Sequence, residues 1–176
     1  NSCEPARVRI EATPDEDIHV QLVWNTPGDP DQTDGNGTDV DLHYLNSAVG
    51  QWDQAPWDIF WRNTTGDWGI PGNTSDDPSL DIDDTDGAGP ENVNHDNPQG
   101  DRNYSVGVYY YNDNGYGPIY ATVRVYIQGT ERFQIKEKYM EREDTFWDVA
   151  YITWPDAATS PQEGIVARDR IRSGFP

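Results

Sequence analysis

The 176-residue chain has very little cysteine, few basic residues and no long apolar run. Its single cysteine, Cys3, has no partner within the chain, so an internal disulfide is excluded. No segment approaches the ~18 consecutive apolar residues of a membrane-spanning helix, and we therefore expect no membrane insertion.

Basic residues are scarce, because 12 Lys and Arg stand against 32 Asp and Glu, which gives a net charge of −20. Phosphate binding needs a basic face, so we expect no nucleic-acid partner. Two explanations of the acidity remain open: a bound divalent cation that offsets the repulsion, and adaptation to high salt. The chain is expected to be a monomer by default, with calcium-mediated self-association as the alternative.

Aromatic residues are abundant, with seven Trp, ten Tyr and four Phe. Many lie in segments that alternate apolar with polar residues, the pattern of half-buried strands. The expected strands cover residues 6–12, 18–24, 39–45, 57–62, 104–112, 120–127, 133–138 and 146–154. These strands predict an all-β fold, an antiparallel, jelly-roll-like β-sandwich of about eight strands with long acidic loops. We expect one domain over residues 1–158 and a linker-like tail over residues 159–176.

One short loop, residues 81–92, collects an unusual number of carboxylates. Hard cations such as Ca²⁺ take six to eight oxygen ligands from carboxylates and loop carbonyls, and a glycine-bent acidic loop supplies both. The alternative is a solvated acidic turn in an acidic protein. The candidate metal ligands of this loop are Asp81, Asp83, Asp84, Asp86 and Glu91.

The spacing D-x-D-x-T-D-G occurs at residues 81–87 and also at residues 29–35. Neither copy is an EF-hand loop, which has Gly at its sixth position and Glu at its twelfth. The repeat has a chance explanation as well, because Asp and Gly are common throughout the chain. We expect one or two Ca²⁺ sites, and further candidate ligands are Asp29, Asp31 and Asp34.

A third acidic motif, D-V-D-L-H, begins the expected strand at residues 39–45. Successive side chains of a strand point to opposite faces, so Asp39, Asp41 and His43 share one face. The two carboxylates can then reach a single ion. Imidazole suits softer metals than calcium, and we expect His43 to orient a neighbouring carboxylate by a hydrogen bond. An ordinary exposed polar face is the alternative.

Four tryptophans lie between residues 51 and 70: Trp52, Trp57, Trp61 and Trp68. Exposed indole rings stack against sugar rings, which makes this segment a candidate ligand-binding surface. The alternative is that the rings cover an open end of the core, and the pattern does not separate the two.

The motifs D-x-D-L-H at residues 39–43 and G-x-G-P-E at residues 87–91 together resemble YfaP-like domains of bacterial exported proteins. The similarity covers about residues 18–154. It implies a β-sandwich distantly similar to the calcium-stabilised sandwiches attached to secreted peptidases and collagen-binding proteins. It also implies an extracellular or cell-surface location, with acidic motif positions at Asp39, Asp41, Asp84 and Glu91.

Three functions follow from these patterns. The favoured one is a non-catalytic calcium-binding module that acts in adhesion or structural display and contacts an extracellular glycan or protein surface. The second is a calcium-stabilised carbohydrate-binding module that uses the tryptophan segment. The third is a carboxylate-based glycoside hydrolase. An enzyme is not expected, because the sequence has no G-x-S-x-G motif and its three histidines lack zinc-site spacing.

Overall fold

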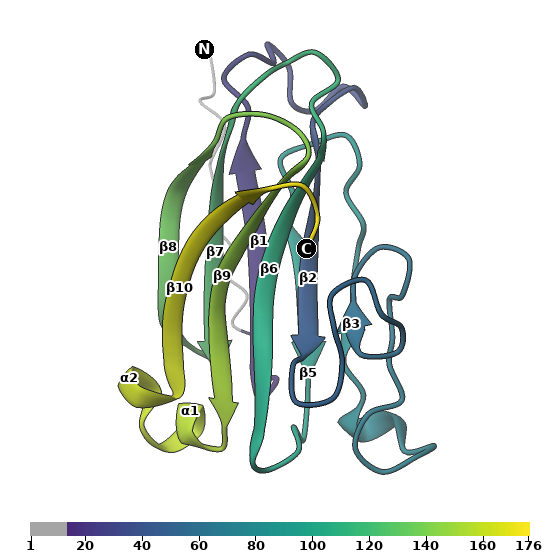
Figure 1. The fold of residues 1–176 in the computed structure, drawn as a ribbon, viewed down its shortest axis with the longest axis vertical. Helices are drawn as coiled ribbons and strands as arrows, with labels where there is room; N and C mark the ends of the chain where they lie inside the picture. Colours follow the sequence, from purple (N-terminus) through teal and green to yellow (C-terminus); the bar gives the residue numbers. More distant parts are fainter. Residues whose placement is uncertain (1–13) are drawn as a thin grey trace, which may run out of the picture.

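The structure is a computed structural model, and it describes residues 14–176. It is a β-sandwich of two five-stranded antiparallel sheets that pack face to face (Figure 1). The predicted antiparallel β-sandwich is confirmed, with ten strands in place of about eight. The strand expected over residues 6–12 lies outside the described residues.

The first sheet has the strand order β4-β5-β1-β7-β8, and the second has the order β10-β9-β6-β2-β3. The strands of the first sheet are β4 (Ser79–Leu80), β5 (Glu91–His95), β1 (Ile18–Asn25), β7 (Ile119–Ile127) and β8 (Thr130–Met140). Those of the second are β10 (Ile165–Ser173), β9 (Thr145–Trp154), β6 (Arg102–Asn112), β2 (Asp39–Asn46) and β3 (Asp58–Ile59). The helices are single turns: the 3₁₀ helix η1 (Thr74–Asp76), α1 (Asp156–Thr159) and α2 (Pro161–Gly164). None of the helices in residues 14–176 is long and apolar enough to cross a membrane.

The core lies between the two sheets and is built from alternate residues of each strand. In β1, Ile18, Val20, Leu22 and Trp24 are buried in this core. In β2, the core residues are Val40, Leu42 and Tyr44, so Asp41 and His43 point to the opposite face of the sheet. The alternation that predicted these strands is therefore the alternation that the core uses.

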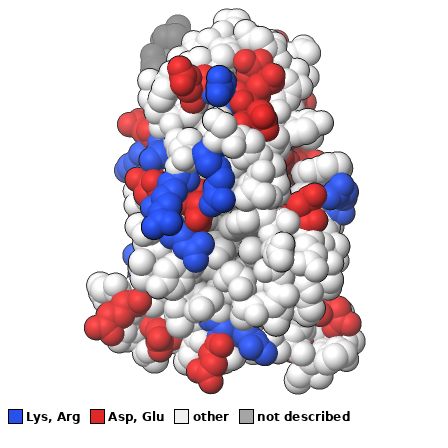
Figure 2. Space-filling view, in the orientation of Figure 1, with Lys and Arg blue, Asp and Glu red and all other residues white. Residues whose placement is uncertain are grey.

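Residues 159–176, expected to be a linker-like tail, instead contain α2 and the edge strand β10. This strand pairs with β9 from Ile165 opposite Ile152 to Ser173 opposite Thr145. Residues 165–173 show no apolar alternation because an edge strand on the outside of the sandwich leaves most of its side chains exposed. Two arginines of β10, Arg168 and Arg172, lie 3.4 and 3.5 Å from the buried Asp148 carboxylate of β9. Figure 2 shows a group of Lys and Arg side chains over this strand.

Candidate metal centre

A cavity of about 250 Å³ lies beside the first residues of β2. Its wall combines carboxylates from β2 and from the loop between β4 and β5 with two aromatic rings, one from β6 and one from the segment after β3. The residues that line this acidic cavity are Asp39, Asp41, Trp61, Asp83, Thr85 and Tyr111.

The start of β2 places two of these carboxylates. Asp41 lies opposite Tyr109 of β6, and both side chains are on the outer face of the second sheet. The pairing shifts between Asp39 and Val40, which marks a β-bulge. A bulge re-aims the side chain next to it, and here Asp39 lines the same cavity as Asp41.

Two carboxylate oxygens of the cavity are buried without a hydrogen-bond partner. Asp41 is only 3% exposed, and its Oδ2 is enclosed but accepts no hydrogen bond within the described chain. The same is true of Oδ1 of Asp39. Burying a carboxylate oxygen without a donor or a counter-charge costs free energy, so buried polar groups normally have partners. These two oxygens therefore mark a place where a partner is missing.

The electrostatics of the cavity agree with its geometry. Burial raises the pKa of Asp39 to about 7, and the charges of Asp83 and Asp84 add to the rise. Burial likewise raises the pKa of Asp41 to about 8, with further contributions from Asp39 and Asp83. Burial and the neighbouring Asp84 raise the pKa of Asp83 as well. Each carboxylate is harder to ionise because it is buried and, in addition, because other carboxylates are close.

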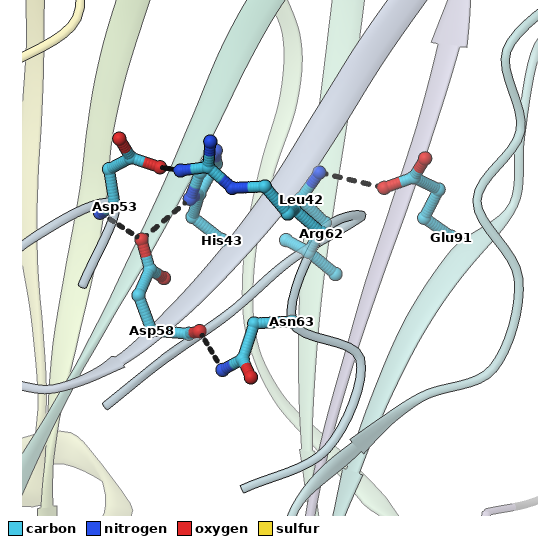
Figure 3. Close-up of polar contacts among 7 residues, drawn as sticks. All are labelled: Leu42, His43, Asp53, Asp58, Arg62, Asn63 and Glu91. Carbon is cyan, nitrogen blue, oxygen red and sulfur yellow. Dashed lines mark hydrogen bonds and ion pairs between the residues drawn. The ribbon is translucent and has the colours of Figure 1, made fainter. Parts of the chain in front are cut away.

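Glu91 fastens the acidic loop to β2 rather than lining the cavity. Its Oε2 accepts a 2.7 Å hydrogen bond from the backbone N–H of Leu42, which Figure 3 shows. Its Oε1 accepts a 3.1 Å bond from the backbone N–H of Asp84. Burial raises the pKa of Glu91 well above its usual range, although these two bonds lower it. The side chain thus ties β5, the loop and β2 together.

Asp84 also organises the loop from within. Its Oδ2 accepts a 2.9 Å bond from the backbone N–H of Gly89, and its Oδ1 accepts a 3.3 Å bond from that of Asp86. A Cβ on Gly87 would lie 2.8 Å from Asp84 Oδ2, so the loop needs glycine there. Asp84 therefore shapes the loop, and its charge raises the pKa of Asp39 and Asp83 although Asp84 does not line the cavity.

The other two carboxylates of residues 81–92 lie away from the cavity wall. Asp81 accepts a 2.6 Å bond from Nδ2 of Asn94 and lines a different cavity. Asp86 contacts the earlier acidic loop, where its carboxylate would lie 3.4 Å from a Cβ on Gly35. The two acidic loops therefore touch.

The earlier copy of the D-x-D-x-T-D-G spacing uses its carboxylates on its own turns. Oδ1 of Asp29 accepts from the N–H of Asp31, Oδ1 of Asp31 from that of Thr33, and Oδ1 of Asp34 from that of Asn36, at 2.9, 3.2 and 3.0 Å. Aspartate commonly stabilises turns in this way. Oδ2 of Asp29 is enclosed and has no hydrogen-bond partner in the described part of the chain, but none of the three residues lines the acidic cavity.

The four tryptophans of residues 51–70 have different environments. Trp68 is 1% exposed and stacks on Tyr44 and Tyr104, each at 5.8 Å between ring centroids. Trp57 packs against the core, and Trp52 packs edge-on against Phe146. Trp61 alone of the four is exposed, at 47%, and it lines the acidic cavity. Trp68 and Trp57 therefore pack on the core, and among the four only Trp61 has the exposure that stacking against a ligand requires.

His43 orients a carboxylate, but the carboxylate belongs to Asp58. The His43 Nδ1 lies 2.8 Å from Asp58 Oδ2 in a fully buried pair, and that oxygen also accepts from the N–H of Asp53 (Figure 3). The imidazole stacks on Phe60 at 4.8 Å. Sequence reasoning missed Asp58, and nothing local in the sequence marks it. It also missed Tyr111, although the alternation along β6 places that ring on the outer face.

The cavity therefore has three carboxylates, Asp39, Asp41 and Asp83, that could contribute oxygen ligands to one cation. Among residues 14–176, no group of three or more His, Cys, Asp or Glu side chains has the arrangement of a metal-binding site. The three carboxylates wall the cavity without forming a closed shell, so an ion there would need small side-chain rotations and further oxygens. In comparisons with known proteins, no family model, no curated protein and no solved structure matches the chain.

Proposed function

We propose that this chain is a non-catalytic calcium-binding β-sandwich module whose ion lies in the acidic cavity. The single observation that carries the proposal is the buried Asp41 carboxylate, whose Oδ2 has no hydrogen-bond partner among residues 14–176 and which lines the cavity together with Asp39 and Asp83. A cation supplies the missing counter-charge and lets all three carboxylates ionise at neutral pH.

Calcium fits this donor set better than other common metals. The candidate ligands are all oxygen atoms, and the nearby imidazole of His43 is committed to Asp58. Zinc favours nitrogen and sulfur ligands, whereas calcium accepts oxygen ligands in flexible geometry. Magnesium demands near-ideal octahedral geometry, which a loop carboxylate and two strand carboxylates do not readily supply.

The biological setting is an exported or cell-surface bacterial protein, in which the module acts in adhesion or structural display. The resemblance of the D-x-D-L-H and G-x-G-P-E motifs supports this setting. An ion between β2 and residues 81–90 would add a link between the two sheets beside the Glu91 contact. It would stiffen the face that meets a glycan or protein partner.

Thermal melts in EDTA, in millimolar CaCl₂ and in millimolar MgCl₂, at fixed ionic strength, test the calcium proposal. A ligand at one hundred times its dissociation constant stabilises a fold by about 2.7 kcal/mol, which is about 5–10 °C for a domain of this size. We expect a rise of this order in calcium, larger than in magnesium. Identical melts in all three solutions would refute the proposal.

A matched pair of variants assigns the effect to the cavity. Asp41→Asn removes a ligand charge and part of the repulsion, so it should abolish the calcium response and raise the melting temperature in EDTA. Asp101→Asn changes the net charge equally at an exposed position outside the cavity, and it should leave the calcium response intact. Equal behaviour of the two variants would place the ion elsewhere.

A carboxylate-based glycoside hydrolase is the second candidate, and one observation favours it. Asp41, with its pKa raised to about 8, shares a cavity with two other carboxylates and an exposed tryptophan. A protonated carboxyl beside an ionised one is the arrangement of a glycosidase general acid. Release of nitrophenol from aryl glycosides in EDTA, suppressed by calcium and by Asp41→Asn, would favour the enzyme. Absence of release would favour the binding module.

A further inference from the structure

Two aromatic rings that line the acidic cavity are left about half exposed by the described residues. Trp61 is 47% and Tyr111 is 54% exposed, and both line the cavity beside Asp39 and Asp41. Every other tryptophan of the chain is more buried than Trp61. Exposed indole and phenol rings cost free energy in water unless a partner covers them.

Both rings are held in place by neighbours. Trp61 packs edge-on against Phe60, with centroids 6.2 Å apart and planes at 86°, and the Arg62 guanidinium lies 5.8 Å from the indole. Tyr111 lies 6.2 Å from Tyr109 of the same strand. The contacts of Trp61 with Phe60 and Arg62 restrict its ring, so this ring loses less conformational entropy when a ligand stacks on it.

The wall also leaves calcium short of ligands. Ca²⁺ takes six to eight oxygens, and the side chains of the wall offer the carboxylates of Asp39, Asp41 and Asp83 and the hydroxyl of Thr85, which supply fewer than six ligands when each binds through one oxygen. Glu91 and Asp84 already accept backbone hydrogen bonds that hold the loop. An ion held in this way would take its remaining oxygen ligands from outside these side chains, and Trp61 and Tyr111 line the same cavity.

We infer that the calcium ion, Trp61 and Tyr111 form one binding site for the vicinal hydroxyl groups of a neutral sugar. Two adjacent hydroxyl oxygens would fill open positions on the ion. The carboxylates that hold the ion would accept hydrogen bonds from the same hydroxyls. The apolar C–H face of the sugar ring would stack on the indole.

The charge of the site selects a neutral ligand. Three carboxylates around one Ca²⁺ leave a net negative site in a chain whose formal net charge is −20, which disfavours acidic peptides and acidic sugars. A quaternary ammonium ligand would also suit aromatic rings and carboxylates, but it would compete with calcium instead of requiring it.

This inference rests on the proposed calcium site, so the experiment measures ion binding and sugar binding separately. Calorimetric titration with CaCl₂ comes first, on the wild type and on the Trp61→Ala and Tyr111→Ala variants. Neither ring is proposed as a metal ligand, and we expect all three proteins to bind calcium alike. A wild type that binds no calcium refutes the proposed function, and this inference with it.

The calcium-loaded proteins are then applied to an array of neutral oligosaccharides. Hits are confirmed by titration with the corresponding methyl glycoside and with a deoxy analogue that lacks one hydroxyl of the vicinal pair. We expect binding that EDTA abolishes and that each aromatic substitution weakens by about tenfold or more. Tyr120→Ala, which removes an exposed ring of β7 in the other sheet, should have no effect.

Four results would overturn the inference while leaving the calcium site intact. They are an empty array with calcium-loaded protein, sugar binding that survives EDTA, sugar binding that Trp61→Ala leaves unchanged, and full binding of the deoxy analogue. Binding of tetramethylammonium that calcium blocks would likewise overturn it, because the rings would then form a cation cage.

Discussion

The two ends of β5 contain buried ionisable groups in opposite situations. At the end of the strand, His95 is enclosed by Tyr44, Trp68 and Tyr104, with ring centroids 5.1–5.8 Å away. Burial lowers the pKa of His95 to about 4, so the imidazole is neutral at pH 7 and accepts or donates at Nδ1 with the Tyr44 hydroxyl. At the start of the strand, Glu91 ties the acidic loop to β2, and burial together with the nearby charges of Asp41 and Asp83 raises its pKa.

The difference shows two ways in which a fold accommodates a buried ionisable group. A lone histidine among aromatic rings loses its charge at little cost, and the core then closes around it. A group of carboxylates loses its charge only in part at neutral pH, because the pKa values of Asp39 and Asp41 are raised to about 7 and 8. The aromatic end holds a neutral imidazole whose Nε2 is buried without a partner among the described residues, whereas the acidic end gathers several carboxylates that the proposed cation would neutralise.

The largest expected effect is a loss of stability at the aromatic end of β5 that leaves ion binding unchanged. Trp68→Ala removes the ring that stacks on Tyr44 and Tyr104, and it should cost about 3–5 kcal/mol of unfolding free energy. The shift in melting temperature on adding calcium should be retained, because Trp68 does not line the acidic cavity. Denaturant unfolding measures the loss of unfolding free energy, and thermal melts with and without calcium measure the shift in melting temperature.

Trp61→Ala is the matched control for this prediction. It removes the same side chain from an exposed position, so it should change the unfolding free energy by about 0.5 kcal/mol or less. If the two substitutions destabilise the protein equally, Trp61 is a packing residue and the contrast between the two ends fails.

An intermediate effect concerns pH in the metal-free protein. The carboxylates of Asp39 and Asp41 have folded-state pKa values above their unfolded values, so their protonated forms stabilise the native state. Their contribution is present below the unfolded pKa and is lost as pH rises through about 7 and 8. In EDTA, the unfolding free energy should therefore fall by about 1–3 kcal/mol between pH 6.5 and 8.5.

Between pH 6.5 and 8.5, the titration of His95 contributes little to the change in unfolding free energy. His95 has a folded pKa below its unfolded value, so it lowers stability only as pH falls from about 6.5 toward 4. Calcium should remove the alkaline loss, because ion binding requires the ionised carboxylates. A pH dependence between 6.5 and 8.5 that is the same in calcium and in EDTA would contradict the assignment.

Much of the sandwich was predictable, because its central strands face the core on one side. The alternation of Ile18, Val20, Leu22 and Trp24 predicts β1, and that strand is as expected. The sequence did not predict edge strand β10, because apolar burial does not hold this strand on the sheet. It is held by backbone pairing with β9 and by the contacts of Arg168 and Arg172 with Asp148. Such partners lie far apart in the sequence and leave no periodic pattern.

The acidic residues of the candidate site are among those that the sequence predicted, but the sequence did not predict the role of each one. The D-x-D-x-T-D-G spacing marks aspartates, yet the same spacing suits a metal loop and a series of aspartate-stabilised turns. Only the fold shows that Asp83 lines the cavity while Asp84 holds the loop. In the same way, Trp61 and Trp68 have the same chemistry, and their burial depends on the path of the chain.

The smallest expected effect tests how the acidic end is attached to β2. Glu91→Gln keeps one carbonyl acceptor and replaces the other oxygen with an amide donor, so one of the N–H groups of Leu42 and Asp84 loses its partner. The loss is partly offset because the substitution removes a negative charge from the cluster, and we expect a net cost of about 1 kcal/mol. The hydrogen-exchange rate should rise at one of these two backbone amides, and it should stay unchanged at the amides around His95. Unchanged exchange at both amides would mean that Glu91 does not fasten the loop, and the two ends of β5 would then differ in charge alone.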